Sequence, residues 1–225
     1  MKILTCAALC AAAILVSSCS KDDATVTPPN STTAVSEYWM PTAAGSRTIL
    51  EEVSVTKMGS VTMDSSVRST TMTMMPGTKT TLDGKSALII QNIGSSKSGL
   101  DTSFSYMVLT AESMVMYDDS LKAEDATVQL KAPLTVGNNW LLRSADTVRC
   151  TIQSVTETVV TPAGTFQNCI RVRALPPFGE DVTATSDITF AKGVGVVKYE
   201  MLATGDVGGI TYTMKTLSTL KSKSF

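Results

Sequence analysis

The chain has 225 residues, with 19 Lys and Arg against 20 Asp and Glu, a formal net charge of −1 and no histidine. Its charges are interspersed and leave no basic face to displace counterions from phosphates, so we expect no nucleic acid partner. Without histidine, Ser-His-Asp or Cys-His nucleophiles and imidazole metal sites are excluded. We therefore expect no metal, no cofactor and no enzymatic activity.

The first residues have the pattern of a lipoprotein signal peptide. Lys2 precedes an apolar run at 3–16, and small residues then lead to Cys19. The run is too short and too rich in small residues for a lasting transmembrane span. We assign 1–18 to a signal peptide and predict that Cys19 carries acyl chains such as palmitate, which anchor the chain to a membrane.

The residues after this cysteine give the expected location. Lys21, Asp22 and Asp23 resemble the export signal of Bacteroidota lipoproteins, which implies an outer-membrane protein that faces the cell exterior. The alternative is a solvated charged tether on the periplasmic face. Residues 19–36 are rich in Pro, Ser and Thr and cannot bury enough apolar surface to fold, so we predict a flexible tether.

Residues 37–225 are rich in Thr, Ser and Val, with turn signals at roughly 8 to 12 residue spacing, which is typical of antiparallel strands. We predict one all-β domain, folded as a single curved sheet or half-barrel of about a dozen strands; the alternative is a β-sandwich. Asp83-Gly84 favours a hairpin turn, and Ser120 to Val128 favours a short helix. The candidate strands are 46–57, 60–74, 87–93, 102–109, 112–117, 126–131, 138–143, 148–152, 166–174, 183–190, 194–203 and 209–217.

Two segments of the domain are alike. Pro41 stands four residues before Gly45, and Pro133 stands four residues before Gly137, each at the start of a candidate strand. Pro fixes φ and Gly accepts conformations closed to other residues, so both segments would set the angle at which a strand begins. They indicate a half-domain duplication near residue 130, with a chance match as the alternative.

Three patterns in the last 90 residues or so resemble an uncharacterised family of secreted bacterial β-domains. They are a Pro-x-x-x-Gly-Asn-x-Trp stretch ending at Trp140, the stretch from Thr161 to Val172, and the stretch from Lys192 to Glu200. The resemblance implies a curved antiparallel sheet similar to the half-barrel of lipoprotein-carrier domains. It implies no catalytic residue.

Carboxylates leave one weak enzymatic alternative, a glycosidase that needs only two suitably spaced Asp or Glu residues. The candidates occur as neighbours in the sequence, and neighbours on a strand point to opposite faces, so we expect solvated surface charges. The pairs are Glu51-Glu52, Asp118-Asp119, Glu124-Asp125 and Glu180-Asp181.

Two cysteines remain in the domain. If 162–165 turn a hairpin, Cys169 lies opposite residue 157 or 158, and Cys150 lies about 25 Å further along the same strand. We therefore expect two free thiols. Bending of the first strand into another sheet would weaken this expectation.

Methionine is abundant, with 12 residues, and alternation places Met72 with Met74, and Met114 with Met116, on one strand face each. We expect these side chains to fill a core, because Met packs irregular gaps readily. The alternative is a groove for an apolar ligand in the concavity of the sheet.

The function that follows is a surface-anchored lipoprotein with a non-enzymatic binding or structural role in the cell envelope. The alternative is a carrier or sensor of an apolar small molecule, and the weaker one is the glycosidase. The expected partner is an envelope protein, a glycan or an apolar ligand. Ser120 and Thr147 each follow Asp and precede an apolar residue, which is similar to the Bacteroidota O-glycosylation acceptor.

Overall fold

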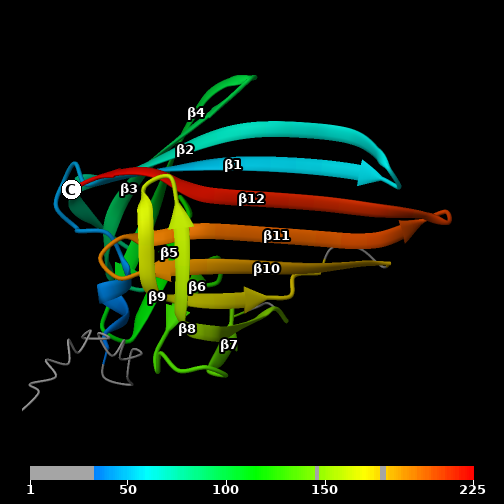
Figure 1. Cartoon of the computed structure of the whole chain (residues 1–225). Coiled ribbons are helices and arrows are strands. Elements are labelled where there is room, and N and C mark those ends of the chain that lie inside the picture. The colour runs from blue at the N-terminus through cyan, green and yellow to red at the C-terminus, as the bar shows by residue number, and fades with distance from the viewer. Residues whose placement is uncertain (1–32, 145–146, 178–180) are drawn as a thin grey trace, which may run out of the picture.

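In the computed structural model, which describes residues 33–144, 147–177 and 181–225, twelve antiparallel strands form one sheet (Figure 1). The predicted single curved sheet is confirmed, and Asp83-Gly84 lies in the turn before the third strand. The lipidation and export residues Cys19, Lys21, Asp22 and Asp23 lie outside the described residues. The strands are β1 (Arg47–Met58), β2 (Val61–Thr80), β3 (Ser86–Ser96), β4 (Gly99–Leu109), β5 (Ser113–Tyr117), β6 (Thr127–Lys131), β7 (Asn139–Leu141), β8 (Arg149–Thr161), β9 (Gly164–Ala174), β10 (Val182–Ala191), β11 (Gly195–Val207) and β12 (Ile210–Ser224).

The strand order is β6-β5-β4-β3-β2-β1-β12-β11-β10-β9-β8-β7, so the first and last strands pair at the centre. Short links join consecutive strands, which fits antiparallel pairing because no crossover is needed. The sheet curls until its edge strands β6 and β7 meet, where Val128 N–H donates to the Leu142 carbonyl at 2.8 Å. The result is a nearly closed, barrel-like sheet.

The N-terminal end of the described chain fills the inside of this curl. A short 3₁₀ helix, η1 (Val35–Tyr38), is followed by Trp39 and Met40, and all of these apolar side chains pack into the main core. Val35 is fully buried. The folded part therefore begins at least two residues before the expected boundary at residue 37.

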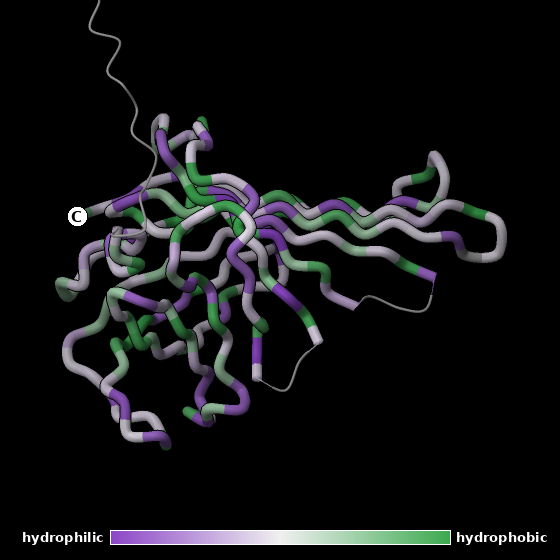
Figure 2. Tube along the Cα trace, turned by 90° about the horizontal axis from the view of Figure 1, so that it is seen from below, coloured by the Kyte–Doolittle hydropathy of each residue, from purple (hydrophilic) through white to green (hydrophobic). Residues whose placement is uncertain are grey.

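Parts of β1, β2, β10, β11 and β12 extend beyond the core as a flat projection, which we call the arm (Figures 1 and 2). It comprises residues 53–67 of β1 and β2, 182–187 of β10, and 200–217 of β11 and β12. Residues 61–68 of β2 pair with β1 alone, because the ladder with β3 begins at Ser69. The turns after β1 and β11 lie side by side at the arm tip, where Gly59 N–H donates to the Thr211 carbonyl at 2.7 Å.

The expected helix at Ser120 to Val128 is wrong. This segment forms turns, and β6 begins at Thr127. The Asp118 carboxylate accepts the Ser120 N–H at 2.9 Å, and the Ser120 hydroxyl donates to Asp125 at 2.9 Å. Such local side-chain bonds compete with the backbone bonds of a helix. A positive φ of 54° at Leu121 also departs from helical geometry.

The two Pro-x-x-x-Gly segments make the same hydrogen bonds. Gly45 N–H donates to the Met74 carbonyl, and Gly137 N–H donates to the Ile152 carbonyl, both at 2.9 Å. The N–H groups of Met74 and Ile152 return bonds to the residues after these glycines, also at 2.9 Å. The two glycines have φ of 89° and 87°. This equivalence supports the half-domain duplication, which stays a prediction.

Candidate functional site

The four methionines of the expected groove lie in or against the main core. Met74 and Met114 have at most 1% of their surface exposed and belong to the same cluster as Trp39 and Trp140. Met72 and Met116 are partly buried against that cluster. Their side chains fill the space inside the curled sheet together with the segment that follows η1.

Both cysteines of the domain are free and buried, and Cys169 lies opposite Glu157 as predicted. Burial raises the pKa of each thiol to about 11. Three register shifts interrupt the ladder between β8 and β9, so the hairpin bends and β8 contacts β11 and β12. Cys169 packs with Val197 and Leu220 in a core cluster separate from the main core.

The other sequence candidates are surface groups. Ser120 and Thr147 are exposed, although Asp146 of the second acceptor lies outside the described residues. Glu51 pairs with Lys221. Glu52, its neighbour on β1, projects from the opposite face of the sheet. Glu180 is not described.

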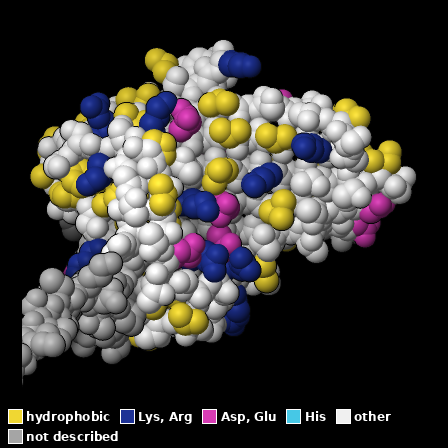
Figure 3. Space-filling model, viewed as in Figure 1, with side chains coloured by type: hydrophobic (Ala, Val, Ile, Leu, Met, Phe, Trp, Pro, Cys, Tyr) yellow, Lys and Arg dark blue, Asp and Glu magenta, His cyan; other side chains and the backbone are white. Residues whose placement is uncertain are grey.

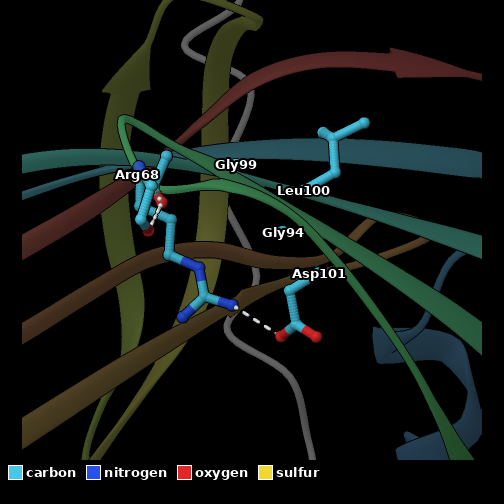
Figure 4. Close-up of a pocket in the computed structure, with 7 residues that line it drawn as sticks. Arg68, Gly94, Gly99, Leu100 and Asp101 are labelled. Carbon is cyan, nitrogen blue, oxygen red and sulfur yellow. Dashed lines mark hydrogen bonds and ion pairs between the residues drawn. The ribbon is translucent and has the colours of Figure 1, made fainter.

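A polar pocket of about 230 Å³, the fork pocket, opens where the β3–β4 hairpin leaves β2 (Figure 4). Its lining consists of Arg68 and of hairpin residues between Gly94 and Asp101. Arg68 Nη2 lies 3.5 Å from an Asp101 carboxylate oxygen, with the two side chains 48% and 73% exposed. Leu100 points away from this ion pair, as alternation along the strand requires. The pocket therefore offers donors from a guanidinium and acceptors from a carboxylate.

Gly94 makes room for the Arg68 side chain. A Cβ atom at position 94 would lie 3.0 Å from Arg68 Nε and 3.1 Å from Cζ, and closer still to Nη2. Gly94 is absent from the glycines with positive φ, so its backbone does not require glycine. A glycine within a strand often marks the close approach of another group. Here that group is the guanidinium.

The outer face of the arm carries a second set of candidate groups (Figure 3). Val53 lies between Val67 and Leu217 in one cross-strand row, and Val53 and Val67 are 41% and 51% exposed. A hollow of about 250 Å³ next to this row is lined by Val55, Thr213 and two lysines, Lys57 and Lys215.

Ion pairs border this apolar row on the same face. Arg173 holds Asp187 through two bonds of 2.8 and 2.6 Å, and Lys198 lies 2.9 Å from Glu200. Hydrogen bonding to Asp187 raises the pKa of Arg173. The charges of these four side chains are therefore largely neutralised within the sheet.

The fork pocket was missed at the sequence level. Arg68 and Asp101 belong to different strands, and only the departure of the β3–β4 hairpin brings them together. Gly94, directly after the candidate strand 87–93, was the available signal, because glycine inside a strand is unfavourable unless something needs the space.

Comparisons with known proteins show the fold. No family model and no curated protein matches the chain. The structure is similar to a Bacteroides fragilis protein described as a proposed exported protein with a YmcC-like fold, at 13% identity and a TM-score of 0.50, over 83% of this chain and 99% of that one. It is also similar to a proposed lipoprotein from Parabacteroides distasonis, at 14% identity and a TM-score of 0.43, over 82% and 97%.

Two further structural observations concern membrane-spanning helices and metal sites. Within the described ranges, no helix has the length and apolarity needed to cross a membrane. Among those same residues, no group of three or more Cys, Asp or Glu side chains gathers as metal ligands do.

Proposed function

We propose that this chain is a lipid-anchored outer-membrane protein that faces the cell exterior and has a non-enzymatic binding role, carried by its arm. The anchor is Cys19, and Lys21, Asp22 and Asp23 direct export. The observation that carries the proposal is the position of the N-terminal segment relative to the arm tip.

The described chain enters the sheet at the end opposite the arm tip. Val35 N–H donates to the Ala111 carbonyl in the β4–β5 turn at 2.8 Å, and Gly193 N–H in the β10–β11 turn donates to the Glu37 carbonyl at 2.6 Å. The β10–β11 and β11–β12 turns lie at opposite ends of β11. An anchor that precedes residue 33 would therefore be attached to the domain at the end opposite the arm tip. Exposed apolar residues on such a projection are typical of interaction surfaces.

Cysteine labelling on intact cells tests the location and the orientation together. Ser60 is exposed in the turn at the arm tip, and Cys150 and Cys169 are buried. We expect a membrane-impermeant maleimide to label the Ser60→Cys variant on intact cells. A matched variant that also has Lys21, Asp22 and Asp23 replaced by Ala should stay unlabelled. Labelling of Ser60→Cys only after the outer membrane is permeabilised would place the protein on the periplasmic face instead.

The binding role has its own measurement. Native mass spectrometry with lipid extraction, on the full chain from mild detergent, distinguishes an arm-borne role from the carrier alternative. A co-purified apolar molecule that leaves when Met114 is changed would support the carrier. Because Met114 has no exposed surface and packs in the main core, we expect the chain to carry no such molecule.

A further inference from the structure

We propose that the fork pocket binds a hydroxyl-rich ligand, a neutral saccharide unit, held between the Arg68 guanidinium and the Asp101 carboxylate. The inference goes beyond the proposed role of the arm, because the fork pocket is formed by Arg68 and the β3–β4 hairpin, which lie outside the arm. It does not depend on the anchor or on the direction of the arm.

The orientation of Arg68 is the first observation. In the ladder between β1 and β2, Arg68 lies directly opposite Glu52, a carboxylate that could pair with it across the strands. The guanidinium instead crosses Gly94 and reaches Asp101 on the hairpin (Figure 4). Among the described residues, Asp101 is its one charged partner. Arg68 thus lies in the open pocket and does not pair with Glu52, its neighbour across the strands.

The glycine that makes room for it is the second observation. Gly94 pairs with Thr70, one pair inside the end of the β2–β3 ladder, where a side chain would normally stabilise the strand. Its backbone has no positive φ, so the space above it is what the missing side chain supplies. The Arg68 guanidinium occupies that space and reaches Asp101 in the lining of the pocket.

The chemistry of the lining selects the ligand. Neighbouring hydroxyls of a sugar accept hydrogen bonds from a guanidinium and donate them to a carboxylate, so they satisfy both charged groups at once. An anionic ligand would meet the negative charge of Asp101. The hydroxyls of Ser96 and Ser98, which lie 2.7 Å apart in the same lining, can donate and accept further bonds. Because Arg68 and Asp101 are exposed and 3.5 Å apart, their own pairing is weak and leaves donors and acceptors for a ligand.

The test uses the purified full chain on an array of neutral and acidic oligosaccharides, followed by titration calorimetry with the best neutral glycan. We expect Arg68→Ala and Asp101→Ala each to weaken binding about tenfold or more, the range for a lost charged hydrogen bond. Gly94→Ala should have a similar effect, because its methyl group displaces the guanidinium while the backbone stays favourable. Ser95→Ala, on the same strand and exposed, is the matched control and should bind as the unchanged protein does.

Each other result overturns the inference. Absence of binding to every neutral glycan would show that the pocket has no saccharide ligand. Binding of acidic glycans that strengthens in Asp101→Ala would assign an anion instead. Equal loss in Ser95→Ala would show a general effect on the hairpin. Normal maleimide labelling of Ser60→Cys beside failed glycan binding would leave the anchored location standing and remove the ligand alone.

Discussion

The indole N–H of Trp140 donates to the backbone carbonyl of Val128 at 2.8 Å, so a side chain bridges the seam between β7 and β6. The other large indole of the core, Trp39, is equally buried, yet its N–H has no hydrogen-bond partner among the described residues. A comparison of Trp140 with Trp39 therefore separates the contribution of a hydrogen bond to stability from that of packing.

We predict that Trp140→Phe lowers the free energy of unfolding more than Trp39→Phe does, by about 1 to 2 kcal/mol. The first change leaves the Val128 carbonyl unpaired, and the second removes a buried donor that is already unpaired. Urea unfolding followed by far-ultraviolet circular dichroism measures both. Equal losses would contradict a bonding role for Trp140.

Val35 gives a test of where the folded part begins. It is fully buried, so Val35→Ala should lower the free energy of unfolding by about 2 kcal/mol, from lost burial plus the cavity left behind. The control is Val160→Ala, because Val160 is 75% exposed, and we expect a change of no more than about 0.5 kcal/mol there. The same urea titration suffices. If both variants match the unchanged protein, the core does not depend on η1.

Two of the arginine–carboxylate pairs, Arg173–Asp187 and Arg68–Asp101, should differ in strength. Arg173 holds Asp187 through two bonds, and the Asp187 side chain is only 14% exposed. Arg173→Leu leaves this carboxylate without its cation, and we expect a loss of about 2 kcal/mol in the free energy of unfolding. Arg68→Ala breaks an exposed pair and should cost about 0.5 kcal/mol or less. A loss at Arg68 as large as that at Arg173 would mean that the fork pocket stabilises the fold.

Stability should fall in alkaline solution. Burial raises the pKa of Cys150 and Cys169 to about 11 from 9.0, and that of Tyr38 to about 12 from 10.0. The unfolded chain releases these protons at lower pH than the folded chain does. The stability that these groups contribute is therefore complete below about pH 9 and decreases as the pH rises toward 11 and 12.

We expect the urea midpoint of the unchanged protein to decrease above pH 9. Between pH 10 and 12 it should also decrease relative to the midpoint of Tyr38→Phe, which lacks the hydroxyl. Midpoints of both proteins at pH 8, 9.5, 10.5 and 11.5 measure the two changes. A difference that stays constant over this range would argue against a buried Tyr38 hydroxyl in solution.

Gly45→Ala and Gly137→Ala should lower stability by similar amounts, about 1 to 2 kcal/mol each. Both glycines have φ near 90°, and an added Cβ would meet no atom within 4 Å at either position, so conformational strain is the whole expected cost. Calorimetric or urea unfolding of the two variants provides the comparison. Clearly unequal losses would weaken the case for a duplicated half-domain.

Much of the fold could be predicted from residue patterns because antiparallel strands alternate locally between polar and apolar residues and are joined by short turns. Alternation and turn residues placed all twelve strands, and the Asp83-Gly84 turn was predicted from two residues. The end of β2 was set too early at residue 74, since Pro76 and Gly77 indicate a turn. In the structure a register shift between Met74 and Thr78 carries the strand through them to Thr80. Bulges of this kind depend on the partner strand.

The candidate site could not be predicted in the same way. The fork pocket depends on a side chain of β2, a missing side chain of β3 and a carboxylate of β4. Arg68 and Asp101 are each ordinary in a strand, and Gly94 indicates a close approach without showing which group approaches. Only the point where β3 leaves β2, at Ser69 and Ser95, makes them neighbours.

The central pairing of the sheet joins the two ends of the domain, since Arg47 lies opposite Ser224. Every other ladder joins strands that are consecutive in the chain and can form as soon as its hairpin exists. A ribosome or an export channel delivers β1 first and β12 last. Until the last residues arrive, the two halves of the sheet lack their central pairing and can meet only at the β6–β7 seam and around η1, and both β1 and β11 keep an open edge. The formation of β12 thus completes the sheet, and we expect a chain truncated before β12 to form two loosely joined meanders.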